Sequence, residues 1–165
     1  MNNEITTTNT TAIPTADDAA FELTVTSDRF GHGFSLADDI QTAGGNFCSL
    51  LATDNKARVT LYNACSNPEK LSAHVNEPIK MMHVFAEVIQ CANEQSGEIV
   101  NCPRVVIIDD HGKGYQAVSV GIYNSVKRII ALFGNPDSWD SPHTIKCKNV
   151  DIGGGQHTYT LEVLE

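Results

Sequence analysis

The sequence predicts a mainly β fold: an antiparallel five-stranded barrel with one helix between its third and fourth strands, behind a disordered N-terminal arm. Three observations predict it. Stretches of strand length with alternating or continuous apolar residues follow one another from about residue 46 onwards. A single stretch, residues 119–133, combines helical spacing of apolar residues with start and stop signals. The first 20 residues show neither pattern.

The N-terminal part of the chain differs in composition from the rest. Residues 1–20 are rich in Thr and Asn and show no periodicity, so we expect a disordered arm. Residues 21–165 then form the domain, with residues 21–45 as its N-terminal extension. Within this extension, residues 21–26 alternate apolar and polar residues and predict a short edge strand. Residues 30–45 are rich in Gly and Asp and predict a loop with at most one helical turn.

The first strand of the barrel is predicted at residues 56–65, with residues 47–52 leading into it. Under the period of two that strands impose, Val59 and Leu61 share an apolar face. The opposite face is basic and aromatic, and it holds Lys56, Arg58, Thr60 and Tyr62. Pro68 ends the strand.

A long, bent strand is predicted at residues 79–92. Its apolar residues also fit a helical pattern, but its β-branched residues and the alternation of Lys80, Met82 and Val84 favour a strand. Fourteen residues is long for one strand, so we expect strong curvature or a bulge near its middle. Residues 93–101 are polar and predict a connection.

A hairpin and then a helix are predicted next. Residues 104–120 read as two strands joined by a glycine-containing turn at residues 109–114. The helix begins at Ser119 or Gly121 and ends before Gly134. Its apolar residues have the i, i+3, i+4, i+7 spacing of an amphipathic helix, and they are Val126, Ile129, Ile130 and Phe133.

Two further strands complete the chain, one at residues 144–150 and one from Tyr159 to the C-terminus, joined by a glycine turn at residues 153–155. Five antiparallel strands with a single helix between the third and the fourth is the layout of an OB barrel. Closure of such a small sheet removes the edges that it would otherwise expose. No segment alternates strands with repeated helices, which argues against a doubly wound parallel sheet.

The net charge of the 165-residue chain is −9, which argues against DNA binding because affinity for phosphates needs Lys and Arg. The charge is unevenly distributed, however. Residues 1–45 carry seven acidic residues and one basic residue, Arg29, and so account for two-thirds of the excess. Residues 46–165 are only mildly acidic, which leaves room for a local basic groove.

Single-stranded nucleic acid is held by cations that follow the phosphates and by aromatic rings on which bases stack. Side chains of these kinds recur along the predicted strands and at the hairpin turn, and the candidate single-stranded DNA contacts are Lys56, Arg58, Tyr62, Lys80, Phe85, Arg104, Lys113, Tyr115, Lys146 and Lys148. We rank the Lys113–Tyr115 pair first, because a turn flanked by glycines does not easily bury it. The alternative for any one lysine is an ordinary solvated charge, and the alternative for Tyr62 or Phe85 is a packed ring.

No motif in the sequence indicates catalysis, and no metal or other cofactor is predicted. Adjacent Asp109 and Asp110 on a strand would point to opposite faces, so we interpret Asp-Asp-His as part of a turn rather than as a metal site. The glycines at residues 153–155 lack the Lys-Ser/Thr and the following helix of a phosphate loop. The five cysteines are widely spaced and form no C-x-x-C pair, which predicts reduced thiols, most of them packed.

Part of the chain resembles a known family. The segments that carry the resemblance are EPIKMMHV (77–84), EVI (87–89), PRVVIID (103–109) and GKGYQAVS with VGIYNS (112–125). Over about residues 46–165 the chain is similar to the single-stranded DNA-binding proteins of phages and mobile elements of Gram-positive hosts. This resemblance implies an OB-like fold, binding of single strands with little sequence preference, and a role in replication or conjugation.

We therefore expect a non-enzymatic protein that coats and protects single-stranded DNA during phage or mobile-element replication. Single-stranded DNA is the expected partner, replication proteins such as a polymerase are candidate partners, and no membrane partner is expected. The oligomeric state stays open between a monomer and a small homo-oligomer. The sequence has no signal-peptide pattern and no apolar run of membrane-spanning length, so we expect the host cytoplasm. The alternative is an OB-like protein–protein adaptor that does not bind nucleic acid; a nuclease is disfavoured because no carboxylate cluster supports it.

Overall fold

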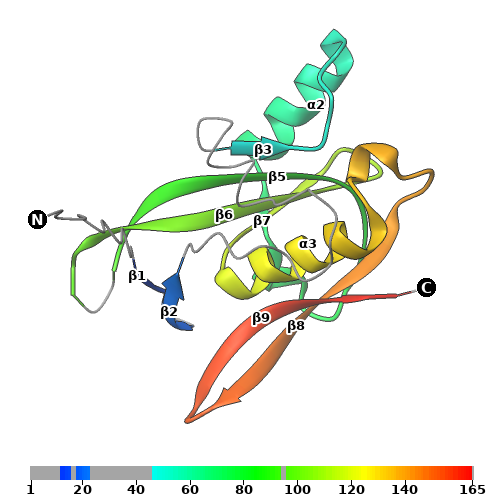
Figure 1. Cartoon of the computed structure of the whole chain (residues 1–165). Coiled ribbons are helices and arrows are strands. Elements are labelled where there is room, and N and C mark those ends of the chain that lie inside the picture. The colour runs from blue at the N-terminus through cyan, green and yellow to red at the C-terminus, as the bar shows by residue number, and fades with distance from the viewer. Residues whose placement is uncertain (1–11, 16–17, 23–45, 94–95, 165) are drawn as a thin grey trace, which may run out of the picture.

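The computed structural model describes residues 12–15, 18–22, 46–93 and 96–164. These residues form a mainly β structure: a curled, half-barrel sheet of seven strands with two α-helices, and a separate two-stranded sheet (Figure 1). Residues 30–45, for which the sequence predicted a loop, lie outside the described residues. Within the described ranges, no helix is long and apolar enough to cross a membrane.

The small N-terminal sheet consists of β1 (Ala12–Thr15) and β2 (Asp18–Glu22), which pair in antiparallel fashion. Most of it falls within the segment for which the sequence predicted no regular structure. The edge strand predicted at residues 21–26 overlaps the end of β2, and the remainder of that prediction lies outside the described residues.

The large sheet has the strand order β4-β7-β6-β5-β8-β9, with β3 beside β5. Its strands are β3 (Asn46–Cys48), β4 (Glu69–Lys70), β5 (Pro78–Ala92), β6 (Ile99–Asp109), β7 (Gly114–Val118), β8 (His143–Gly153) and β9 (Gln156–Val163). Strand β5 organises the sheet. It pairs with β6 along one edge, while its other edge is shared by β8 at residues 78–81 and β3 at residues 85–87.

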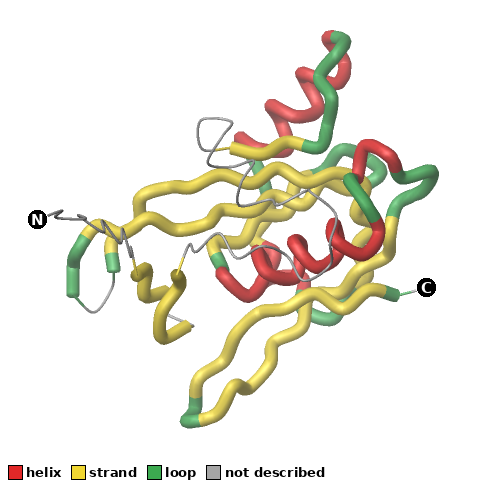
Figure 2. Tube along the Cα trace, viewed as in Figure 1, coloured by secondary structure: helices red, strands yellow, loops and turns green. Residues whose placement is uncertain are grey.

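A bulge is present in the long strand, as predicted, but it lies near the start of β5 rather than near the middle. The register of β5 against β6 shifts between Met81 and His83, close to the point where the partner on the other edge changes from β8 to β3. A bulge of this kind increases local twist and bends the strand. The strand therefore curves, and the sheet wraps around α3 (Figure 2).

Helix α3 (Val120–Phe133) fills the concave side of the sheet, as its amphipathic pattern requires. It begins where the Ser119 hydroxyl accepts a hydrogen bond from the Ile122 N–H at 3.4 Å. It ends at Gly134, whose φ of 83° suits glycine. The apolar side of α3 packs on strand residues such as Val105 and Ile107, and together they form the main core.

The loop after α3 closes the same end of the core. It contains the short 3-10 helix η2 (Pro136–Ser138) and the buried Trp139. The indole N–H of Trp139 donates to the carbonyl oxygens of Phe133 and Gly134, each at 3.1 Å. These bonds satisfy carbonyls that the end of the helix leaves without a helical partner.

The strand predicted at residues 56–65 is wrong: these residues lie in helix α2 (Asn55–Ser66). The helix starts because the side chain of Asp54 accepts a hydrogen bond from the Ala57 N–H at 2.7 Å, which is an N-cap. Its sheet-facing residues recur at helical spacing. Leu61 and Ala64 pack on a second apolar cluster formed by the opposite face of the sheet. The β-branched Val59 fits a strand equally well in isolation, but the cap and this packing decide for the helix.

The predicted five-stranded barrel with a single helix also differs from the structure. The described residues contain seven strands in the large sheet and a second helix, α2, between β3 and β4. The sheet does not close into a barrel, because β4 and β9 end it on opposite sides and do not pair within the described part of the chain. Because β4 covers only two residues of β7, an open seam remains between the rest of β7 and β9 within the described residues.

Candidate nucleic-acid interface

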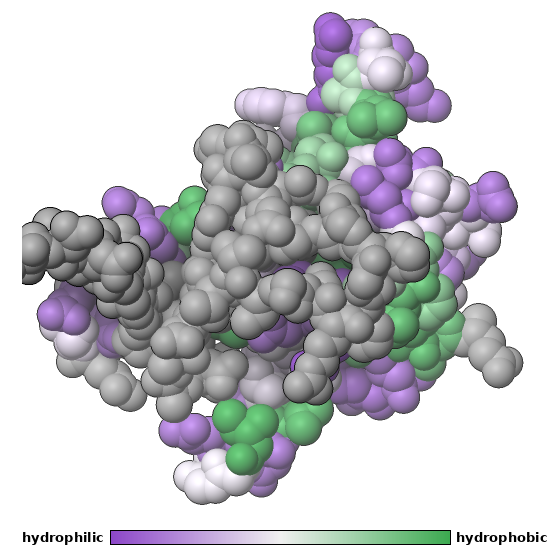
Figure 3. Space-filling view, viewed as in Figure 1, coloured by the Kyte–Doolittle hydropathy of each residue, from purple (hydrophilic) through white to green (hydrophobic). Residues whose placement is uncertain are grey.

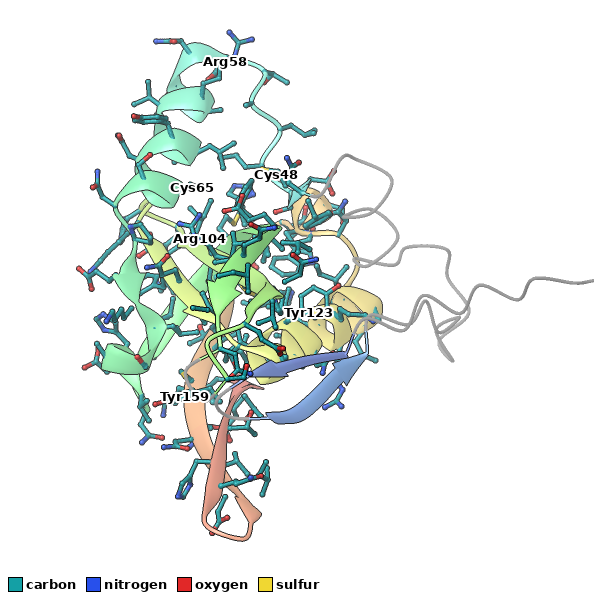
Figure 4. All side chains as sticks on the ribbon, turned by 90° about the vertical axis from the view of Figure 1, so that its left-hand side faces the viewer. Cys48, Arg58, Cys65, Arg104, Tyr123 and Tyr159 are labelled. Carbon is teal, nitrogen blue, oxygen red and sulfur yellow. The ribbon has the colours of Figure 1, made fainter. Side chains whose placement is uncertain are left out.

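Helix α2 projects from the convex side of the sheet, and its outer face is open. In Figure 4 Arg58 lies at the far end of α2, away from the sheet. Arg58 and Tyr62 are four residues apart and so lie on one face of the helix, and the Tyr62 side chain is 70% exposed. Val59 and Leu51 add exposed apolar surface nearby, and Figure 3 shows apolar side chains gathered on α2. We call Arg58, Val59 and Tyr62 the α2 face.

The α2 face combines the two groups that single strands require. The Arg58 Nε donates to the carbonyl of Ala52 at 3.2 Å, which steadies the side chain. No carboxylate pairs with Arg58 or Lys56 among the residues that the structure describes. A cation free to meet a phosphate thus lies one helical turn from a ring on which a base can stack. Lys56 lies on another side of α2 and lines a groove beneath it.

Arg104, another predicted contact, anchors α2 to the sheet. Its Nη1 pairs with Glu87 Oε1 at 2.5 Å, and its Nε donates to Gln116 Oε1 at 3.1 Å. Its Nη2 donates to the carbonyl of Cys65 at 2.7 Å, in the last turn of α2. Figure 4 shows Arg104 beside Cys65, where the helix meets the sheet. All three nitrogens of the guanidinium therefore have protein partners, and its role is to position α2.

Phe85 lies under α2 rather than on an open surface. Its ring packs with Leu61 and Ala64 of the helix and with Val106 and Ile108 of β6. The helix covers this part of the sheet, which sequence reasoning had left open because it placed residues 56–65 in a strand. Phe85 is accordingly a packing residue in this structure.

The hairpin turn ranked first by the sequence is closely tied to its surroundings. Tyr115 is only 8% exposed, so the expectation that the turn leaves it accessible is wrong. Its hydroxyl donates to Asp109 Oδ2 at 3.3 Å, and its ring meets the edge of the His74 ring at 5.2 Å between centroids. The Nζ of Lys113 lies 5.1 Å from the centre of that ring and 2.8 Å from Glu69 Oε1. Lys113 has a carboxylate partner because β4 pairs with β7 and so brings Glu69 beside this turn.

His74, in the 3-10 helix η1 (Leu71–His74), completes this cluster. Its Nδ1 lies 2.7 Å from Glu77 Oε2 and its Nε2 lies 2.6 Å from Glu69 Oε2. The hydrogen bond with Glu77 is the largest of the causes that raise the pKa of His74. The hydrogen bond from Lys113 is the first of those that lower the pKa of Glu69. The cluster is thus a network of ion pairs that holds β4 and η1 to β7.

The turn itself is built as predicted, with Asp109 as its organising residue. The Asp109 Oδ1 accepts hydrogen bonds from the backbone N–H groups of His111 at 2.9 Å and Lys113 at 2.8 Å. Gly112 has a φ of 82°, which glycine tolerates best. In the described residues, no group of three or more His, Cys, Asp or Glu side chains is arranged to hold a metal ion.

The remaining predicted lysines lie apart from the α2 face. Lys80 is exposed at the start of β5, with its Nζ 3.6 Å from Asp110 Oδ2. Lys146 and Lys148 share one face of β8, and the Nζ of Lys148 lies 3.3 Å from Glu162 Oε2. The ten predicted residues therefore fall into several separate groups, of which only Arg58 and Tyr62 join an unpaired cation to an exposed ring within the described part of the chain.

Two hollows border these groups, and their charges differ. The groove beneath α2 has a volume of about 340 Å³, and its charged lining comprises Asp54, Asp109, Asp110 and Lys56, with two histidines besides. The hollow at the open seam has a volume of about 200 Å³, and among the described residues Lys70 is its one charged lining residue. Sequence reasoning missed Lys70, for which there was no signal, and also Tyr159, whose place in an alternating strand was the available clue.

The α2 face has the cation and the exposed aromatic ring with which proteins hold single strands. The family model described as phage single-stranded DNA-binding protein matches residues 43–164, well over half of the chain. The chain therefore belongs to this family, as the sequence resemblance predicted, and it is a single-stranded DNA-binding protein rather than an enzyme. No curated protein and no solved structure matches the chain.

Proposed function

We propose that this protein coats single-stranded DNA without strong sequence preference and protects it during phage DNA replication, with the α2 face as a principal contact. One observation supports this best. Tyr62 is 70% exposed and Arg58 lies one turn away, with no carboxylate paired to it in the described ranges. Every base has a face that can stack and every nucleotide a phosphate, so such a surface binds without reading sequence.

We also propose that strands β5 to β9 with α3 are an OB-type core, to which β3, α2 and β4 have been added. The support is the path β7-β6-β5-β8-β9 through the sheet and the position of α3 in the chain between β7 and β8. Under this proposal the host cytoplasm is the site of action, and replication proteins such as a polymerase are candidate partners.

Anisotropy of a labelled oligo-dT at low salt, titrated with wild-type protein and with variants, tests the proposal. Tyr62→Ala should weaken binding by roughly 5- to 150-fold, because loss of one stacked base costs about 1–3 kcal/mol. Tyr62→Phe keeps the ring and should bind like the wild type. Gln90→Ala, at an exposed position on β5, is the matched control. Wild-type protein that does not bind oligo-dT would overturn the function, and Tyr62→Ala with unchanged affinity would remove α2 as the interface.

The groove beneath α2 favours the second candidate, a protein adaptor. Its carboxylates Asp54, Asp109 and Asp110 outnumber Lys56, and the chain has a net charge of −9. Such a surface attracts basic groups rather than phosphates. A pull-down from host lysate, run beside the oligo-dT titration, tests this second role: an adaptor that acts in addition to DNA binding predicts a captured basic protein partner, and a protein that only coats DNA predicts none.

A further inference from the structure

We propose that the open seam between β7 and β9 binds one nucleotide of the single strand, with its base against Tyr159 and its phosphate on Lys70. This inference rests on the proposed function and adds a second contact site to the α2 face. It concerns a part of the molecule that contains none of the ten residues predicted from the sequence.

The seam exists because neither bordering strand has a strand partner there. Strand β4 covers β7 only at Tyr115 and Gln116, so the end of β7 has no neighbouring strand on that side within the described residues. The edge of β9 is covered by α3 instead of β7. The Leu161 N–H donates to the Ser125 hydroxyl at 3.1 Å. A Cβ at Gly121 would lie 2.2 Å from the carbonyl oxygen of Tyr159, so α3 approaches β9 as closely as glycine permits.

The hollow left at the seam has the chemistry of a nucleotide site. Leu71, Ile122 and Cys147 give it apolar walls, and the half-buried Tyr159 supplies an aromatic ring. Lys70 is exposed at its border. An apolar hollow with few polar groups is typical of small-ligand sites. An aromatic ring beside a cation is the combination that single strands use.

Gln116 lies at the border of the hollow and is tied to α2 through Arg104. Its side-chain oxygen accepts a hydrogen bond from Arg104 Nε at 3.1 Å, which fixes the orientation of the amide. Arg104 also holds the last turn of α2 through the carbonyl of Cys65. One side chain therefore connects the helix that presents the α2 face with the border of the seam.

The relative positions of the two sites suit one continuous strand. In Figure 4 Arg58 and Tyr159 lie towards opposite ends of the molecule, with Arg104 between them. Lys70 follows α2 closely in the chain, separated from its last residue, Ser66, by three residues. The groove beneath α2 is a poorer choice for a nucleotide, since its three aspartates would repel a phosphate. No carboxylate lines the seam in the part of the chain that the structure describes.

Oligo-dT binding by seam variants tests this site, with short and long oligomers compared. We expect Tyr159→Leu to weaken binding of long oligomers about tenfold, and Tyr159→Phe to bind like the wild type, because the ring stacks without its hydroxyl. Lys70→Gln should reduce the slope of log affinity against log salt by about 0.7, the value for one lost phosphate contact on a single strand. Arg128→Gln, an exposed cation on α3 outside both sites, is the control and should leave the slope unchanged.

The outcomes separate this site from the proposed function. Wild-type protein that ignores oligo-dT would overturn both. Wild-type binding that is weakened by Tyr62→Ala but unaffected by Lys70→Gln would overturn the seam alone. Since Lys70 is exposed, Lys70→Gln leaves the core intact, and its result stands even where Tyr159→Leu fails to fold.

Discussion

The α2 face and the β6–β7 turn each combine a cation with a tyrosine, yet they differ in what those side chains do. Tyr62 is 70% exposed, and Arg58 has no carboxylate partner in the part of the chain that the structure describes. Tyr115 is 8% exposed, and Lys113 is paired with Glu69 at 2.8 Å. The difference comes from neighbours that are distant in the sequence but close in space, such as Glu69 and His74 beside the turn. Residue type therefore identifies candidates for DNA contact, while packing decides which of them are available.

Removal of the Tyr115 side chain should have the largest effect, and on folding. Tyr115→Ala leaves a cavity in the main core and removes the hydroxyl bonded to Asp109. We expect it to lower the free energy of unfolding by about 3–5 kcal/mol, measured by urea denaturation. Tyr62→Ala, on the exposed helix face, should leave unfolding almost unchanged. A Tyr115→Ala protein with full stability but weakened DNA binding would reverse the comparison.

Removal of Arg104 should have the next largest effect, because it holds α2 in place. Arg104→Ala deprives Glu87, Gln116 and the Cys65 carbonyl of their donor. We expect a loss of about 2 kcal/mol in the free energy of unfolding, as for hydrogen bonds to charged groups. Weaker oligo-dT binding should accompany it, since the α2 face loses its support. Lys148→Ala, a partner in an exposed ion pair on β8, is the control. Unchanged stability and unchanged binding together would contradict the role of Arg104 as an anchor.

Salt dependence offers a finer contrast between the two cations. Arg58→Gln should reduce the slope of log affinity against log salt by about 0.7. Lys113→Gln should leave the slope unchanged, because Glu69 already neutralises that lysine. Both slopes come from one set of anisotropy titrations over a range of salt concentrations. The opposite pattern, in which Lys113→Gln lowers the slope and Arg58→Gln does not, would make the β6–β7 turn the better candidate for DNA contact.

The smallest expected effect is a dependence of the free energy of unfolding on pH, through His74 beside the β6–β7 turn. The pKa of His74 is raised above its ordinary value of 6.5, chiefly by the hydrogen bond with Glu77. Its contribution to stability is fully present below pH 6.5 and is lost as the pH rises through the folded-state pKa. The urea midpoint of the wild type should therefore fall by a small amount as the pH rises from 6.5 through that pKa, and His74→Gln should not show this fall. A midpoint that rises over the same range in the wild type, and not in His74→Gln, would contradict this sign.

Elements with a strong local signal could be predicted from the sequence. Helix α3 has its cap at Ser119, its apolar spacing and its glycine stop, and β5 has the length that predicts a bend. Helix α2 could not be recognised from residues 56–65 alone, because Val59, Leu61 and the polar residues between them also fit period two. The deciding signals were the Asp54 cap and the contact of Leu61 and Ala64 with the sheet. The Asp54 cap could be recognised in the sequence. The contact of Leu61 and Ala64 with the sheet could not, because it depends on where β6 lies.

The residue types of the candidate site could be predicted from the sequence, but their positions in the fold could not. Arg58 and Tyr62 were among the ten predicted residues, although for a strand face rather than a helix face. Arg104 and Phe85 were chosen by residue type, and their partners Glu87 and Val106 come from strands whose pairing no local pattern reveals. The seam with Lys70 and Tyr159 arises from the failure of β7 and β9 to pair, which is a property of the whole sheet.

Photo-crosslinking tests most directly whether DNA lies on the α2 face rather than on the β6–β7 turn. Oligo-dT that carries a single halogenated uracil is irradiated with the wild-type protein at low salt, and the crosslinked peptide is identified by mass spectrometry. We predict crosslinks at Tyr62, and none at Tyr115. Crosslinks at Tyr115 together with an unlabelled Tyr62 would contradict this account.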